Sequence, residues 1–164
     1  MDDDAPSLNR KDQRPRREKS LLARALGYLA RREHSRLELS RKLAPHAASA
    51  DELERLLDDL EANRLLSEAR FVDVLTRSRG ARFGVARVRQ ELKSHGVDED
   101  LLRGAVDQLK QTEWARARAL WQRRFGQPAA DAAGRAKQMR FLAGRGFSSE
   151  VIRRVVAGAD DDDR

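Results

Sequence analysis

The stretch that decides the fold is Ser67–Leu109, SEARFVDVLTRSRGARFGVARVRQELKSHGVDEDLLRGAVDQL. Apolar residues recur in it at the i, i+3, i+4 and i+7 spacing of helices that bury one side. The spacing predicts three short helices, over Glu68–Arg79, Val85–Ser94 and Glu99–Leu109. Their predicted buried faces hold, in chain order, Phe71, Val74 and Leu75; Val85, Val88 and Leu92; Leu102, Ala105, Val106 and Leu109.

The residues between these helices are typical helix boundaries. Ser67 and Asp98 are expected to cap the first and third helices, because their side-chain oxygens accept hydrogen bonds from unpaired backbone N–H groups. Gly96 is expected to end the second helix in the left-handed conformation. Gly80 and Gly84 bracket the first connection, and we interpret both as turn formers.

The polar faces of this stretch are strongly basic. An apolar seam therefore lies beneath a cationic surface, which carries Arg70, Arg77, Arg79, Arg82, Arg87, Arg89 and Lys93.

Composition limits the classes of protein that fit. The chain has 164 residues, 40% hydrophobic and 37% charged, with a formal net charge of +7 and no cysteine. It contains no run long enough to span a membrane and no apolar signal core, and the lack of cysteine fits a cytoplasmic protein. Residues 20–158 carry about +9, so we expect a polyanionic partner, either nucleic acid or an acidic protein surface.

Helical patterns continue on both sides of the central stretch. Residues 20–66 show three of them, including capping boxes at Ser35/Glu38 and Ser49/Glu52, and residues 112–158 show three more, starting at Thr112, Gly134 and Ser148. Nothing in the chain is typical of a strand. We therefore expect nine helices in three groups, at 20–66, 67–111 and 112–158, between a disordered leader (1–19) and an acidic tail (159–164).

The second and third groups repeat one another at an offset of 50 residues. Leu92–Val97 falls on Leu142–Phe147, and the polar cap and short apolar-faced helix that follow also match. A period of this length predicts an all-α fold of three tandem three-helix repeats in an elongated, curved array.

We find no pattern that indicates catalysis or a cofactor. His34, His46 and His95 do not lie at metal-ligand spacing, and no glycine-rich phosphate loop is present. Asp58, Asp59 and Glu61 lie opposite the leucines of their helix and are expected to be solvated. We therefore predict no catalytic residues, no metal site and no cofactor.

Two other features have alternative interpretations. Trp114 and Trp121 could stack on bases, but they share a helix face with Ala117 and Leu120 and are better explained as core. The helix Val85–Ser94 could enter a DNA groove, but Arg89 and Gln90 are its only candidate base readers, so phosphate contact is favoured over sequence readout.

Three motifs together resemble the RecX regulatory proteins of bacteria. They are ARREHSRLELSRKL at Ala30–Leu43, DVLTRSRGARFGVARVRQEL at Asp73–Leu92 and KQMRFLAGRGFSSEVIR at Lys137–Arg153. The resemblance covers about Ser20–Ala157. The aspartate runs at both ends and the alanine-rich Gly126–Gly134 depart from the pattern of the family.

The resemblance implies a non-enzymatic protein that binds the RecA recombinase filament on DNA. Members of that family lie in the groove of the filament and inhibit ATP hydrolysis, strand exchange and co-protease activity, which restrains recombination and the SOS response. On this basis we expect a monomer without cofactors. Its predicted contact surface for RecA and for DNA phosphates consists of Arg70, Arg77, Arg82, Arg87, Arg89, Lys93, Arg135, Lys137, Arg140 and Arg145.

Two alternatives remain open at this stage. A regulator that binds duplex DNA directly would bind tightly without RecA. A helical adaptor would have a protein partner whose binding is insensitive to salt, and the basic excess argues against it.

Overall fold

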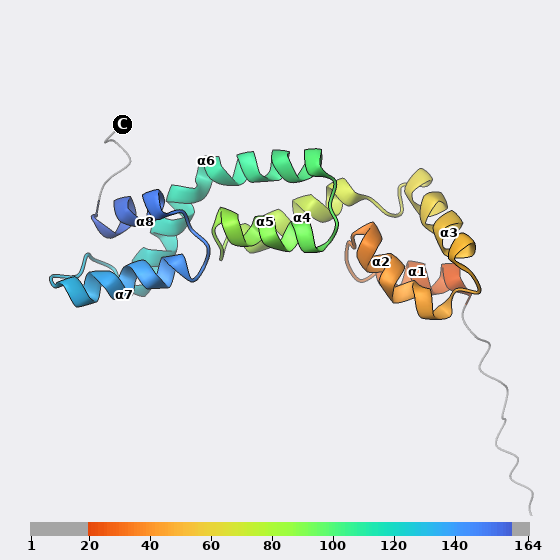
Figure 1. Ribbon diagram of the computed structural model, residues 1–164, viewed down its shortest axis with the longest axis horizontal. Coiled ribbons are helices and arrows are strands. Elements are labelled where there is room, and N and C mark those ends of the chain that lie inside the picture. Colours follow the sequence, from red (N-terminus) through yellow and green to blue (C-terminus); the bar gives the residue numbers. More distant parts are fainter. Residues whose placement is uncertain (1–19, 159–164) are drawn as a thin grey trace, which may run out of the picture.

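The computed structural model describes residues 20–158, and this part of the chain is entirely helical. Figure 1 shows an elongated molecule with α1–α3 at one end, α4, α5 and the start of α6 in the middle, and α7 and α8 at the other end. The predictions for the leader and the acidic tail lie outside the described residues. The elements are α1 (Leu21–Leu29), α2 (Arg36–Leu43), the 3-10 helix η1 (Ala44–His46), α3 (Ala50–Ala62), α4 (Glu68–Gly80), α5 (Val85–Ser94), α6 (Glu99–Arg124), α7 (Ala132–Ala143) and α8 (Ser149–Val156).

The predicted starts of the three central helices, and the predicted end of the second, are confirmed. The Ser67 hydroxyl accepts a hydrogen bond from the backbone N–H of Arg70 at 3.3 Å, and the Asp98 carboxylate accepts one from Asp100 at 2.9 Å. Gly96 has a φ of 65°, the left-handed value that ends α5. Ser35, Ser49 and Ser148 cap α2, α3 and α8 in the same way.

The expected break between the second and third groups is wrong. Thr112 does not cap a new helix, because α6 runs without interruption through it, so residues 20–158 hold eight α-helices instead of nine. No glycine or proline separates Leu109 from Glu113, and the buried positions 109, 113, 117 and 121 keep one continuous i+4 stripe. The boundary predicted at 111/112 therefore falls inside a helix that belongs to both units.

Helix α7 also differs from its predicted bounds. We expected it at Gly134–Arg145, and it spans Ala132–Ala143. The Asp131 carboxylate caps it by accepting a hydrogen bond from the N–H of Gly134. An aspartate before an alanine-rich turn is a local signal for the start of a helix.

Each of the three units has its own hydrophobic core. The core of the first unit joins α1, α2 and α3; that of the second joins α4, α5 and the first half of α6; and that of the third joins the second half of α6 with α7 and α8. Trp121 is in the third core, with its indole N–H donating to Gln138 at 3.1 Å. Trp114 is half-buried and packs against the same core.

Some residues placed on buried faces are exposed. Val74 is 48% exposed and Val72 is buried in its place, because α4 packs against both α5 and α6 and its buried face is turned toward their junction. The same spacing places Leu22 and Leu26 on the predicted buried face of the first helix and Met139 on that of the helix starting at Gly134, but these three residues are also exposed. At these positions the apolar periodicity predicted helical structure correctly and misassigned the exposure of the side chains.

The second and third units are joined by direct backbone contact. The N–H of Gly84 donates to the carbonyl of Arg145 at 2.8 Å, and the N–H of Ala86 donates to that of Gly146 at 3.2 Å. A Cβ atom on Gly84 would lie 2.2 Å from the Gly146 carbonyl oxygen. Gly84 has a φ of −75°, so it is needed for this close approach and not, as predicted, for a turn.

The first and second units are joined by side chains. Arg70 Nε donates to the Glu33 carboxylate at 2.7 Å, and Leu37 packs closely against Gly96. On α3, Asp58, Asp59 and Glu61 are exposed as predicted. Asp58 and Glu61 also pair with Arg36, at 2.8 and 2.7 Å.

Among residues 20–158, no helix is both long and apolar enough to cross a membrane.

Candidate polyanion-binding surface

Charge is distributed unevenly along the array. Residues 20–66 hold eight basic and eight acidic side chains, residues 67–111 hold nine and seven, and residues 112–158 hold ten and three. The excess of positive charge therefore lies on the second and, above all, the third unit. The first unit is neutral and has the composition of an ordinary solvated helical surface.

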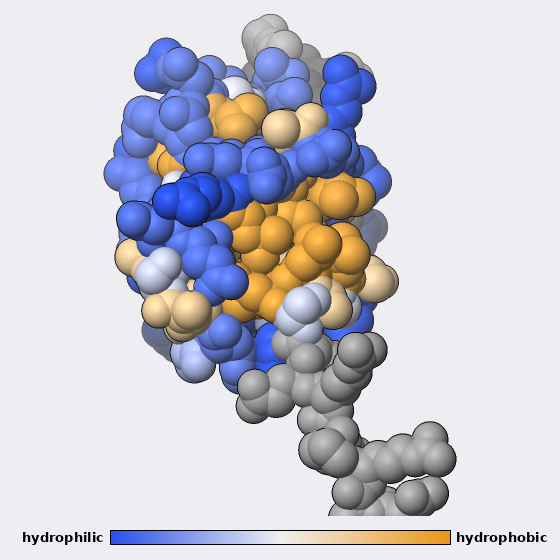
Figure 2. Space-filling view, turned by 90° about the vertical axis from the view of Figure 1, so that its right-hand side faces the viewer, coloured by the Kyte–Doolittle hydropathy of each residue, from blue (hydrophilic) through white to orange (hydrophobic). Residues whose placement is uncertain are grey.

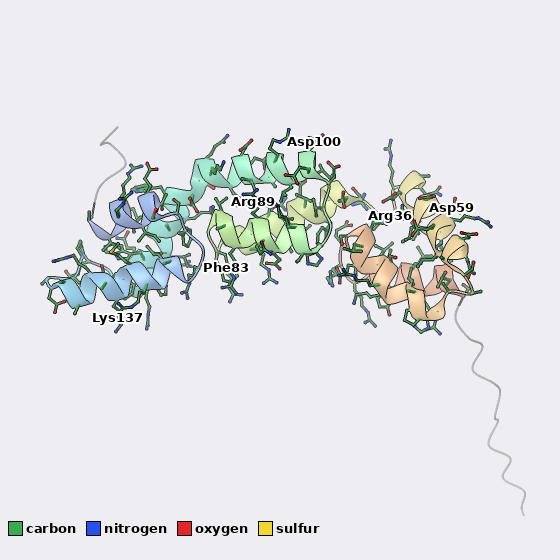
Figure 3. The ribbon with its side chains drawn as sticks, in the orientation of Figure 1. Arg36, Asp59, Phe83, Arg89, Asp100 and Lys137 are labelled. Atoms are coloured by element: carbon green, nitrogen blue, oxygen red, sulfur yellow. The ribbon has the colours of Figure 1, made fainter. Side chains whose placement is uncertain are left out.

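Five of the ten predicted contact residues are exposed cations that form no ion pair within the described chain. Figure 3 shows Lys137 on the outer side of α7, pointing away from the body of the molecule. Cations without internal partners keep their full charge available for phosphate or carboxylate groups. The five are Arg77, Arg89, Lys93, Lys137 and Arg140.

Three further predicted residues stack on aromatic rings near the joint of the second and third units. The guanidinium carbon of Arg87 lies 4.2 Å from the ring centre of Phe83, and that of Arg82 lies 5.7 Å from it. Arg145 lies 3.8 Å from the ring centre of Phe141. Arg87 and Arg145 each also donate one hydrogen bond to a backbone carbonyl, of Gly144 and Phe141, and a guanidinium over a ring keeps its other N–H donors at its edge.

The remaining two predicted residues serve the fold. Arg70 bonds Glu33 and the carbonyl of Leu65 at 3.3 Å. Arg135 donates to the carbonyl oxygens of Ala129 and Ala130, which holds the turn before α7. The structure thus brings Arg82, Arg87 and Arg145 together and places Arg70 and Arg135 apart from them.

Arg116 is a structural residue that the sequence analysis missed. It is half-buried in α6 and donates to the carbonyl oxygens of Gly80, Phe83 and Leu109 at 2.6, 2.7 and 2.9 Å. Burial lowers its pKa, and the nearby carboxylate of Glu113 opposes that shift. An arginine four residues after Thr112 carries no local signal of this role, because Gly80 and Phe83 come from the end of α4 and the connection that follows it.

A groove of about 630 Å³ also lies at the joint of the second and third units. The side chains of Arg89, Lys110 and Arg154 line it, together with Trp114. Arg118 and Arg154 both approach the Trp114 ring, at 5.1 and 5.6 Å. Sequence spacing alone could not join α5, α6 and α8 at this point.

Within residues 20–158, no group of three or more histidine, aspartate or glutamate side chains is arranged to hold a metal ion.

The fold and this surface define a class: an elongated protein of tandem three-helix units with a cationic second half. Residues 67–106 match the second three-helix domain of RecX, and residues 111–156 match the third. The chain belongs to the RecX family of regulatory proteins.

Relatives and solved structures agree with this assignment. The chain is 56% identical over 146 residues to the regulatory protein RecX of Ralstonia nicotianae, covering 89% of this chain and 92% of the relative. It is 59% identical over 141 residues to that of Leptothrix cholodnii, covering 86% and 90%. The crystal structure of RecX from Lactobacillus salivarius has the same fold, with a TM-score of 0.69 at 18% identity, covering 84% of this chain and 93% of that one.

Proposed function

We propose that this protein is a non-enzymatic regulator of the RecA recombinase. It binds the RecA–DNA filament in the cytoplasm as a monomer and inhibits ATP hydrolysis, strand exchange and co-protease activity, which restrains recombination and the SOS response. The observation that carries the proposal is the identity of 46–59% to regulatory proteins RecX over most of the chain.

The elongated shape supports a steric mechanism. Helix α6 alone has 26 residues, which corresponds to about 39 Å at the rise of an α-helix. A rigid array longer than this helix spans several neighbouring subunits of a helical filament. Bound there, it opposes the subunit movements that accompany ATP turnover and excludes a second duplex.

The cationic second half supports an electrostatic contribution. The exposed cations of α4, α5 and α7, with the stacked arginines at the joint, are placed to contact DNA phosphates within the filament. Contacts of this kind position a protein without reading sequence.

Direct binding to duplex DNA is the second candidate. The observation that favours it is the composition of the third unit, with ten basic and three acidic side chains. It predicts tight DNA binding in the absence of RecA, with steep dependence on salt.

DNA-dependent ATP hydrolysis by RecA tests the proposal, with this protein titrated from below stoichiometry. We expect inhibition. Inhibition at a small fraction of the RecA concentration would indicate capping of filament ends, and inhibition near one protein per few subunits would indicate binding along the groove. Unchanged hydrolysis at several-fold excess of folded protein would overturn the proposal in favour of direct DNA binding.

A further inference from the structure

The first unit carries an exposed groove, lined by leucines and by polar side chains, at the end of the molecule opposite to α7. Helix α2 packs against both α1 and α3, and a groove of about 450 Å³ lies between the start of α1 and α3. Leu21, Leu22 and Leu56 line this α1–α3 groove, and Leu22 is 47% exposed. Leu26, one turn further along α1, is 39% exposed. Figure 2 shows an apolar area on this end of the molecule, bounded by hydrophilic surface.

Leu21 and Leu56 pack against the core of the first unit, but Leu22 and Leu26 do not belong to it. That core is formed by Ala25 of α1 with leucines of α2 and α3. Leu22 and Leu26 flank Ala25 on the outer side of α1 and remain in solvent. Two exposed leucines at i, i+4 spacing beside a groove form the kind of apolar surface that binds another protein.

The rim of the groove is acidic. Asp51, Glu52 and Asp59 line it on the α3 side, against one cation, Arg55. Asp51 and Asp59 form no ion pair with any residue in 20–158, whereas Asp58 and Glu61 on the same helix form ion pairs with Arg36. In Figure 3, Asp59 lies on α3 at one end of the molecule and Lys137 on α7 at the other.

These charges decide between nucleic acid and protein as the occupant. An acidic rim repels phosphate groups, and nucleic acid offers no aliphatic surface to cover leucines. A protein segment with apolar side chains flanked by lysine or arginine can cover the leucines of the groove and pair with the carboxylates at its rim.

We propose that the α1–α3 groove is a docking site for an amphipathic, basic segment of a protein partner. The array then has two separate binding ends: a protein-binding first unit and a polyanion-binding second and third unit. The inference rests on the proposed function in one respect, because it takes the protein component of the RecA–DNA filament as the partner.

The test compares two double variants that leave the net charge unchanged. The groove variant is Leu22→Gln/Leu26→Gln. The control is Leu65→Gln/Val74→Gln, whose side chains are 47% and 48% exposed outside the groove. Circular dichroism and thermal unfolding establish that both remain folded. Affinity is then measured for the RecA–DNA filament and for naked DNA of the same sequence at the same salt concentration.

We expect the groove variant to lose about tenfold or more in filament affinity, as truncation of central apolar contacts does at protein interfaces. Its affinity for naked DNA and both affinities of the control should match the wild type. A third variant, Asp59→Asn, should weaken filament binding at low salt and less at high salt.

Equal filament affinities for the groove variant and the control would overturn the docking site while leaving the proposed function intact. Absence of filament binding by the wild type would instead overturn the proposed function. Sedimentation of the protein alone tests whether a second copy of the chain occupies the groove. Self-association that only the groove variant abolishes would assign the groove to that second copy and overturn the proposal.

Discussion

Two glycines and one buried carboxylate hold the joint between the second and third units. Gly84 and Gly146 let two backbones touch, and a Cβ on either would meet atoms of the other unit within 3 Å. Glu113 is 5% exposed, and its carboxylate accepts the N–H of Val85 at 3.0 Å, which caps α5 from another helix. At this point the fold depends on the absence of side chains as much as on their presence.

Gly84→Ala should lower the free energy of unfolding by about 1–3 kcal/mol, the usual cost of overpacking, because its methyl group separates Gly84 from Arg145 and Gly146. Urea unfolding measures the change. Gly104→Ala is the matched control: Gly104 lies within α6, nothing lies within 4 Å of the position that its added methyl group would take, and we expect it to stabilise the protein by about 0.5–1 kcal/mol. Equal stability of the wild type and Gly84→Ala would contradict the close backbone contact of Gly84 with Arg145 and Gly146.

His34 makes stability depend on pH. The residue is 2% exposed, and its Nδ1 lies 2.9 Å from the carbonyl oxygen of Arg32. Burial lowers its pKa below the ordinary 6.5, with the positive charges of Arg32 and Lys42 acting in the same direction and the Arg32 carbonyl and Glu38 opposing it. A histidine whose pKa is lowered in the folded state binds a proton more readily in the unfolded state, so protonation favours unfolding.

The free energy of unfolding should therefore be constant above about pH 6.5 and fall as the pH drops below it. For Glu38, burial raises the pKa, but the hydrogen bond from Arg32 and the nearby cations lower it further, so its contribution is lost only at more acidic pH, below about 4.5. Urea titrations at pH 7.5, 6.5 and 5.5 test this. His34→Gln should remove the slope in this window, and the same change at the exposed His46 should leave it in place.

At the scale of elements, α6 determines how the second and third units are placed. It contributes to the cores of both units, and because it is one continuous helix it fixes their position relative to each other. Arg116, from the middle of α6, ties down the end of α4 and the connection to α5. A helix shared in this way couples the two units mechanically.

Gln111→Pro should break this coupling. Proline in a helix interior costs about 3 kcal/mol or more, because it removes one hydrogen bond and clashes with the preceding turn. Gln111 is exposed, so Gln111→Ala controls for the loss of the side chain and should change stability little. Calorimetry should show one transition for the wild type and separate, lower transitions for the proline variant. A single unshifted transition would show that α6 is not continuous in solution.

At the scale of the whole molecule, charge separates the two ends. The first unit is neutral, with an acidic rim at the α1–α3 groove, and the third carries ten basic and three acidic side chains. This asymmetry orients the array in the field of a polyanion, with the third unit toward it.

Lys137→Glu/Arg140→Glu should weaken binding to DNA and flatten the dependence of log K on log salt by about two units, one for each phosphate that is no longer bound. Arg31→Glu/Arg41→Glu changes the net charge by the same amount on the first unit and should affect the slope less. Fluorescence anisotropy at several salt concentrations measures both. Identical slopes for the two variants would show that net charge, and not the α7 surface, governs binding.

Local chemistry explains what could be predicted. Ser67, Asp98 and Gly96 act within one or two turns of their own position, so their roles follow from residue type and spacing. The i, i+3, i+4 periodicity predicted the observed bounds of α5 for the same reason. It failed at Val74, Leu22 and Leu26, because a period shows that a helix has an apolar face without showing whether a neighbour covers it.

The sequence by itself determined the helical class, the caps, the repeat and the basic excess, because each depends on neighbours in the chain. Only the tertiary structure decided that α6 is continuous between two units, that Gly84 serves a close backbone approach, and that Arg116 and Glu113 are structural. It also separated cations bound within the fold from those left exposed. Partners that are 28 to 61 residues apart leave no periodic signal, and their contacts exist only after the units have packed.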